Sequence, residues 1–296
     1  MHLARLTTAV VAAALLVSGC TQGNAATGGS SPSPSSPPVT GRYVALGDSY
    51  SAGPLIPTTD LAGGCARSDH NYPSLVADAV NAKTFVDVTC SGADTRDLTR
   101  VQRTFGDARI PPQLRAVTAD TDLVTLGIGG NDLGLFSTLV STCTRLRASD
   151  PQGSPCARQL AARGPDLDAA VTTISRRVAT SLLAIRAKAP RAKVLLVGYL
   201  RLAPDRGTCV GLPLAAGDYA EGRRISRALD AALKTAARRT GTTFVDMYAA
   251  SRGHDICSRD PWVNGSVNDR QKALAYHPFA SGMRADARAV VAALQG

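Results

Sequence analysis

The chain has 296 residues, of which 44% are hydrophobic, and the part after residue 40 suits one globular domain. The formal net charge of +10 is compatible with binding to nucleic acid or to anionic polymers of the cell envelope. The basic residues are spread out, however, and their densest group falls on one expected helix, where a solvated helix face is the simpler interpretation. That group comprises Arg223, Arg224, Arg227, Lys234, Arg238 and Arg239. We therefore expect no nucleic-acid role.

Residues 1–19 have the layout of a secretory signal. Arg5 gives a positive start, Ala9–Val17 are apolar, and small residues lead to Cys20. The apolar run is too short for an ordinary spanning helix. A cysteine after small residues is typical of a bacterial lipobox, which predicts a diacylglycerol on the Cys20 sulfur. We expect a mature chain anchored at the outer face of the cell membrane, the alternative being a plain secretory signal and a secreted protein.

Residues 20–40 are rich in Gly, Ser, Pro, Thr and Ala and predict a disordered tether, because they cannot bury enough apolar surface to fold. Residues 41–296 then form one domain without a second linker or internal repeat. Its cysteines are even in number, which in an exported chain predicts three disulfides, and the sequence alone does not choose the pairing. These cysteines are Cys65, Cys90, Cys143, Cys156, Cys209 and Cys257. Zinc is disfavoured because no close Cys/His cluster exists.

Alternating strands and helices are expected along the domain. Five largely apolar, β-branched runs predict strands buried on both faces. They are Tyr43–Leu46, Thr84–Thr89, Leu123–Ile128, Lys193–Tyr199 and Thr242–Met247. Helical spacing marks Tyr72–Ala82, Asp166–Ala189, Asp218–Arg239 and Ser281–Leu294, with Pro73 in the first turn of the first helix and Ser281 as the N-cap of the last. This order predicts a parallel sheet covered by helices on both faces.

Three of the expected strands end in small and polar residues. The segments are Gly47-Asp48-Ser49, Cys90-Ser91-Gly92 and Gly129-Gly130-Asn131-Asp132. Each alone is also compatible with an ordinary turn or helix cap. Chemistry in parallel sheets gathers beyond the carboxyl ends of the strands, so we expect the three segments to converge on one rim.

These segments contain the parts needed for nucleophilic catalysis. Ser49 is the candidate nucleophile, and a serine alcohol needs a base to take its proton. The backbone N–H groups of Ser49 and Gly92 and the side-chain amide of Asn131 are candidate oxyanion donors. His277, directly before the last helix, is the candidate base, although a surface-loop histidine is the alternative. The other histidines, which lie in the leader or in polar loops, are His2, His70 and His254.

Taken in order, the blocks around Ser49, Gly92, Asn131 and His277 resemble the SGNH hydrolases, also called the GDSL lipase/esterase family. The resemblance covers nearly the whole domain. It implies a flavodoxin-like three-layer α/β/α sandwich with a five-stranded parallel sheet. It also implies that Ser49 attacks an acyl carbon, that His277 is the base, that Ser49, Gly92 and Asn131 form the oxyanion hole, and that no metal or organic cofactor takes part.

Within that family, the six-cysteine domain is similar to the secreted actinobacterial esterases and lipases. Their bridges join neighbouring cysteines. For this chain the similarity implies the pairs Cys65–Cys90, Cys143–Cys156 and Cys209–Cys257.

One position departs from the family pattern. Many members carry an aspartate three residues before the histidine, where this chain has Leu274. A base still needs its second ring nitrogen held, because that fixes its tautomer and orientation. We expect a backbone carbonyl, that of Leu274 or else of Ala275, to hold His277. The alternative is a remote carboxylate such as Asp269 or Asp260.

The leading hypothesis is a monomeric serine esterase or lipase at the cell envelope, acting on acyl lipids or short-chain esters through an acyl-Ser49 intermediate. One alternative is an O-acetyl esterase acting on glycans, because one fold serves many ester substrates. Another is an inactive lipoprotein that binds lipid or glycan on the same fold. Residues 141–164 are the best candidate for a cap over the site, and Trp262 either lines the pocket or packs in the core.

Overall fold

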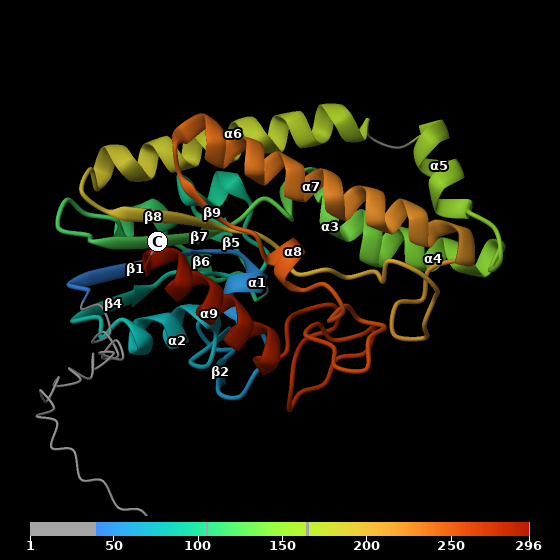
Figure 1. Ribbon diagram of the computed structural model, residues 1–296, viewed down its shortest axis with the longest axis horizontal. Coiled ribbons are helices and arrows are strands. Elements are labelled where there is room, and N and C mark those ends of the chain that lie inside the picture. The colour runs from blue at the N-terminus through green and yellow to red at the C-terminus, as the bar shows by residue number, and fades with distance from the viewer. Residues whose placement is uncertain (1–39, 105, 164–165, 296) are drawn as a thin grey trace, which may run out of the picture. The chain divides into compact units, whose positions relative to one another are not determined.

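The computed structural model describes residues 40–104, 106–163 and 166–295 (Figure 1). The expected leader with Cys20 and the expected tether up to residue 39 lie outside the described residues. No helix of the described ranges is long and apolar enough to cross a membrane.

A five-stranded parallel sheet forms the centre of the domain, in the order β4-β1-β7-β8-β9. Its strands are β1 (Arg42–Gly47), β4 (Thr84–Asp87), β7 (Leu123–Gly127), β8 (Lys193–Val197) and β9 (Thr243–Val245). All five predicted strands are present, which confirms the predicted sheet. β4, β8 and β9 end two residues earlier than predicted, because the chain leaves the sheet there, into loops after β4 and β8 and toward a short helix after β9. Two short antiparallel pairs, β2 (Thr59–Asp60) with β3 (Arg67–Ser68) and β5 (Gln102–Arg103) with β6 (Arg109–Ile110), were not predicted.

Helices cover both faces of the sheet, which confirms the three-layer architecture (Figure 1). α2 (Tyr72–Ala79) and α9 (Ala280–Gln295) pack together on one face, and α6 (Leu167–Lys188) and α7 (Tyr219–Thr240) on the other. Strand β1 shows why the side chains on both faces of the sheet are apolar. Its Tyr43 and Ala45 belong to one buried cluster, whereas Val44 and Leu46 belong to the other. Successive side chains of a strand point to opposite faces, so a strand buried on both faces is apolar throughout.

The ends of the helices follow local rules with one exception. Pro73 lies in the first turn of α2, as predicted, and the Asn71 side chain caps that helix by accepting a hydrogen bond from the Ser74 N–H at 3.0 Å. Helix α7 ends at Gly241, whose φ of +60° suits glycine. The prediction of Ser281 as the N-cap of α9 is wrong, because the helix already begins at Ala280.

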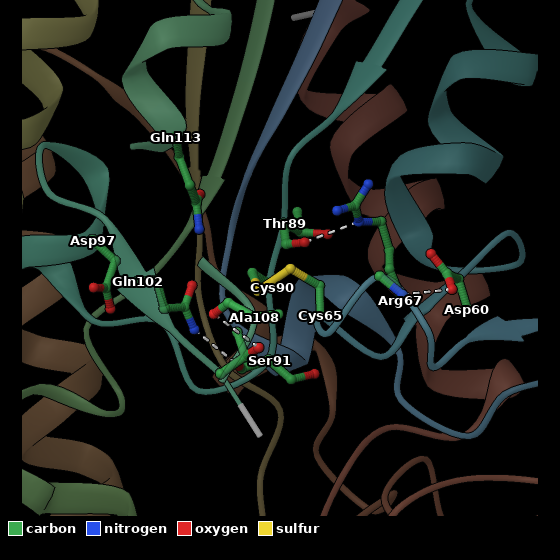
Figure 2. Close-up of a disulfide and its surroundings, with 12 residues drawn as sticks. Asp60, Cys65, Arg67, Thr89, Cys90, Ser91, Asp97, Gln102, Ala108 and Gln113 are labelled. Carbon is green, nitrogen blue, oxygen red and sulfur yellow. Dashed lines mark hydrogen bonds between the residues drawn. A yellow bond between two sulfur atoms is a disulfide. The ribbon is translucent and has the colours of Figure 1, made fainter. Parts of the chain in front are cut away.

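Three disulfides join Cys65 to Cys90, Cys143 to Cys156 and Cys209 to Cys257, the pairs that the family resemblance implies. The first bridge ties the turn between β2 and β3 to the segment that follows β4 (Figure 2). A hydrogen bond of 3.0 Å from the Ser91 N–H to the Cys65 carbonyl reinforces this tie. Disulfides persist in oxidising compartments, so the three bridges indicate an exported protein.

The stretch predicted as a cap is mostly helical. It includes the end of a π-helical segment (Thr138–Cys143), α4 (Thr144–Leu146) and α5 (Pro155–Arg163), while residue 164 lies outside the described ranges. The start of α5 is held by Asp218, whose carboxylate accepts hydrogen bonds from the N–H groups of Cys156 and Ala157 at 3.0 and 2.9 Å.

Candidate active site

Strand β1 places Ser49 directly beyond its carboxyl end, in the first turn of the short helix α1 (Ser49–Ala52). The Asp48 side chain caps that helix by accepting the Tyr50 N–H at 2.9 Å. Gly47 allows the tight turn before it, because a Cβ there would lie 2.4 Å from the Ser51 hydroxyl oxygen and 2.7 Å from the Gly127 carbonyl oxygen. The sequence therefore forms a small, sterically closed turn that carries Ser49.

His277 lies against Ser49, although 228 residues separate them along the chain. The distance from Nε2 of His277 to Oγ of Ser49 is 2.8 Å, and Nδ1 of His277 lies 2.7 Å from the carbonyl oxygen of Ala275. A carbonyl oxygen only accepts hydrogen bonds, so Nδ1 carries the proton and Nε2 is left as the acceptor. This tautomer is the one that can take a proton from the Ser49 hydroxyl.

The carbonyl that holds His277 is that of Ala275, so the prediction of Leu274 is wrong. Tyr276 adopts a φ of +62°, and this turn brings the Ala275 carbonyl to the imidazole ring. The Leu274 carbonyl instead accepts from the His277 backbone N–H at 3.1 Å and from Nδ2 of Asn264 at 3.2 Å.

The two remote carboxylates considered from the sequence have other partners. Asp269 accepts the Gln271 N–H at 2.9 Å. The Asp260 carboxylate lies 3.3 Å from Nδ1 of His254. Within the described residues, neither carboxylate has a hydrogen bond or ion pair with His277.

Burial makes His277 an unusual histidine. The residue is only 7% exposed, and its ring lies 5.4 Å from that of Tyr50 and 5.8 Å from that of Phe136, measured between centroids. This burial disfavours the imidazolium and lowers the pKa of His277 to about 4, against the opposing effect of the Ala275 carbonyl. The imidazole is therefore neutral, and able to accept a proton, over the whole neutral range.

The oxyanion candidates flank the Ser49 turn, because β1 lies between β4 and β7 in the sheet. Gly92, after β4, has a φ of +81°, which favours glycine, and Nε2 of Gln102 holds the preceding Ser91 carbonyl at 2.9 Å (Figure 2). Asn131, after β7, donates one amide hydrogen to the Ala93 carbonyl at 2.9 Å and has a second amide hydrogen to offer. In the described part of the chain, the N–H groups of Ser49 and Gly92 make no hydrogen bond to protein.

A narrow apolar cleft, with a free volume of about 40 Å³, lies beside these groups. Its walls include the rings of Tyr50 and Phe136, which both contact the His277 ring. The other lining residues are Leu135, Leu139, Tyr199, Leu200, Leu202, Ile225, Ser226, Leu229, Asp230 and Tyr248. The described part of the expected cap, residues 141–163, contributes nothing to this lining. Trp262 does not line it either, and stacks on His254 with ring centroids 4.0 Å apart.

Buried polar side chains that the motifs did not reveal surround the site. The Gln113 side chain brackets Gly47, accepting its N–H at 2.8 Å and donating to its carbonyl at 2.9 Å. Asp132 is fully buried and accepts hydrogen bonds from Thr95 and, at 2.9 Å, from Arg177 of α6. These contacts join loops that are distant in sequence, so no local pattern marks them.

Asp48 and Tyr199 form a second contact of this kind. Asp48 is 1% exposed, and one of its oxygens accepts the Tyr199 hydroxyl at 2.5 Å. Burial raises the pKa of Asp48 to about 7, although both of its hydrogen bonds oppose that rise. Tyr199 lies two residues beyond the end of β8, but the predicted strand ran to Tyr199, so the rule that chemistry gathers beyond strand ends did not mark it.

No group of three or more His, Cys, Asp and Glu side chains suited to a metal ion occurs within residues 40–104, 106–163 and 166–295.

Residues 45–285 match the GDSL-like lipase/acylhydrolase family. Lipase 2 of Streptomyces coelicolor is 41% identical over 290 residues, which are 95% of this chain and 94% of that protein. The lipase of Streptomyces rimosus is 33% identical and covers 81% of each chain. The chain belongs to the GDSL-like lipase/acylhydrolase family.

Solved structures of family members share the fold. The crystal structure of phospholipase A1 from Streptomyces albidoflavus has a TM-score of 0.69 and 32% identity, over 87% of this chain and 99% of that one. The extracellular lipase of Streptomyces rimosus has a TM-score of 0.70 and 30% identity, over 86% and 99%. The family predicted from the four blocks is thus confirmed, and this GDSL-family protein is a carboxylic ester hydrolase.

The environment of His277 can be tested by NMR. We expect its imidazole nitrogens to show the neutral Nδ1–H tautomer at neutral pH, and its titration to have a midpoint of about 4. The same histidine in the chain unfolded by urea should titrate at about 6.5. A midpoint near the unfolded value in the folded protein, or an Nε2–H tautomer, would contradict the geometry described above.

Proposed function

We propose that the protein is a serine esterase or lipase in which Ser49 is the nucleophile and His277 the general base. The observation that carries the proposal is the 2.8 Å contact between Oγ of Ser49 and Nε2 of His277, with Nδ1 held by the Ala275 carbonyl. A serine becomes a useful nucleophile when an oriented base lies within hydrogen-bond reach.

Acylation begins when Oγ of Ser49 attacks the carbonyl carbon of the ester and its proton passes to Nε2 of His277. The tetrahedral intermediate collapses as His277 returns that proton to the leaving alcohol, which leaves an acyl-Ser49 ester. Water then attacks the acyl carbon and gives its proton to His277. Ser49 recovers the proton as the carboxylic acid departs.

The negative oxygen of the intermediate needs donors that are in place before the reaction. We assign this role to the N–H groups of Ser49 and Gly92 and to the second amide hydrogen of Asn131. Sheet order supports the assignment, because the loops of β4 and β7 flank the Ser49 turn. The hydrogen bond from Asn131 to the Ala93 carbonyl ties the two flanking loops to each other. One such donor is worth about 3 kcal/mol of transition-state stabilisation.

The apolar cleft is the proposed site of the acyl chain. Its wall residues Tyr50 and Phe136 adjoin His277, so a chain bound there would begin at the reacting carbonyl. An apolar chain transferred from water to such a wall gains about 0.8 kcal/mol per buried methylene. Solved structures named lipase and phospholipase A1 have the same fold, which supports acyl lipids or short-chain esters as substrates.

Esters of p-nitrophenol with increasing acyl length, assayed beside acetylated sugars, test this function. We expect hydrolysis that rises with chain length while methylenes add contacts in the cleft, and little activity on the sugars. A serine-reactive phosphonate should label Ser49, and Ser49→Ala should abolish both labelling and turnover. Ser51→Ala, two residues away, is the matched control and should keep both. Turnover of acetylated sugars alone would favour a glycan esterase, and absence of any adduct in folded protein would favour a binding role.

Mutation can distinguish a His277 that is oriented by a backbone carbonyl from one that is oriented by a carboxylate. We expect Asp269→Asn and Asp260→Asn each to keep kcat within about twofold, because neither carboxylate touches His277. His277→Gln should lower kcat by about 10⁴-fold or more. Steady-state kinetics with a short ester provide the measurement. A loss in either aspartate variant comparable to that in His277→Gln, with the circular dichroism spectrum intact, would show that a carboxylate orients the base.

We also propose that the mature chain is held at the outer face of the cell membrane by a lipid on Cys20. The motif before Cys20 supports this, and the three disulfides agree with export. Native protein should fractionate with membranes, and mass spectrometry should find a diacylglycerol on its N-terminal cysteine. Cys20→Ser should release activity into the soluble fraction. An unmodified Cys20 in protein recovered from the medium would instead establish plain secretion.

A further inference from the structure

The hydroxyl of Tyr199 lies between two segments of the proposed active site. It donates to Oδ2 of Asp48 at 2.5 Å and accepts the Gly130 N–H at 2.8 Å. The Gly130 N–H can only donate, so the hydroxyl accepts from it, and the ionised Asp48 carboxylate accepts the hydroxyl proton. Burial and the neighbouring Asp48 raise the pKa of Tyr199 well above its usual value, so the hydroxyl keeps the proton that it donates.

Each of these partners immediately precedes a residue of the proposed mechanism. Asp48 precedes Ser49 and caps the helix in which Ser49 lies. Gly130 precedes Asn131, whose amide is a proposed oxyanion donor. Tyr199 follows β8, which is separated from β1 by β7, so its hydroxyl reaches across the end of β7 to the nucleophile turn.

The surrounding backbone is adapted to this contact. A Cβ on Gly130 would lie 3.0 Å from Cζ and 3.1 Å from the hydroxyl oxygen of Tyr199, so glycine is what permits the approach. The Tyr199 ring packs edge-on against the Tyr50 ring at 5.1 Å, and both rings form walls of the apolar cleft. The Tyr199 ring therefore lines the cleft, while its hydroxyl makes hydrogen bonds to the two loops that contain Asp48 and Gly130.

We propose that Tyr199 is a positioning residue whose hydroxyl holds the Asn131 loop and the Ser49 turn at a fixed separation, so that an oxyanion donor and the nucleophile meet the same carbonyl. The proposal rests on the function proposed above. Oxyanion donors act because they are in place before charge develops, and a shift of a fraction of an ångström reduces their effect. Tyr199 acts through its neighbours and need not touch the substrate.

Tyr199→Phe tests the proposal, because it removes the hydroxyl and keeps the ring that lines the cleft. We expect kcat for a short ester to fall about 10-fold, less than the roughly 10²–10³-fold lost with an oxyanion donor itself. KM should stay within about twofold, since the cleft wall is unchanged. Tyr43→Phe is the matched control, because it removes a buried hydroxyl bonded to Thr125 at 2.7 Å in the same sheet. It should lower thermal stability to a similar extent and leave kcat unchanged.

A double-mutant cycle with Asn131→Ala tests whether the Tyr199 hydroxyl affects kcat through Asn131. If the hydroxyl acts by placing Asn131, adding Tyr199→Phe to Asn131→Ala should reduce kcat by less than twofold further, a non-additive result. An unchanged kcat in Tyr199→Phe, or the full 10-fold loss in both backgrounds, would overturn the proposal. Ser49→Ala, assayed alongside, keeps the two hypotheses apart. Its inactivity together with an unaffected Tyr199→Phe refutes only the positioning role, whereas an active Ser49→Ala refutes the proposed function itself.

Discussion

The hydrogen bonds around Gly47 hold three loops of the site at once. The Gly47 carbonyl accepts the Cys90 N–H at 3.0 Å, and the next residue, Asp48, donates its N–H to the Gly127 carbonyl at 2.9 Å. Strand β1 is thereby joined to the β4 and β7 sides at the level where all three chains leave the sheet. Because parallel strands end at the same edge, the positions of Ser49, Gly92 and Asn131 all depend on this register.

The base is oriented by a neutral group where many relatives use a charged one. A carbonyl fixes the tautomer of His277 as well as a carboxylate would, but it adds no negative charge to stabilise the imidazolium. Burial without that charge explains why the pKa of His277 is lowered. The proposed mechanism thus has a base that is always available at neutral pH, and it relies on the oxyanion donors for charge stabilisation.

Buried carboxylates connect the elements of the rim. Asp48 and Asp132 would be costly in a dry interior if they were unpaired. Asp48 is satisfied by Tyr50 and Tyr199, and Asp132 by Thr95 and by Arg177 of α6. Each carboxylate draws partners from segments far away in the chain, so the requirement to satisfy buried charge also aligns the loops that form the site.

The five strands, the three layers and the blocks that contain Ser49, Gly92, Asn131 and His277 were all accessible from the sequence, because apolar runs, helical spacing and glycine-rich turns are local properties. Local patterns did not predict the short strand pairs in the loops or the first residue of α9. They also did not choose the Ala275 carbonyl over that of Leu274, which depends on the φ of +62° at Tyr276. Nor did they reveal Tyr199, whose hydroxyl meets Asp48 across 151 residues. The sequence by itself determined which chemical groups stand at the rim. Only the tertiary structure decided their hydrogen-bond partners, because packing of the whole chain brings those partners together.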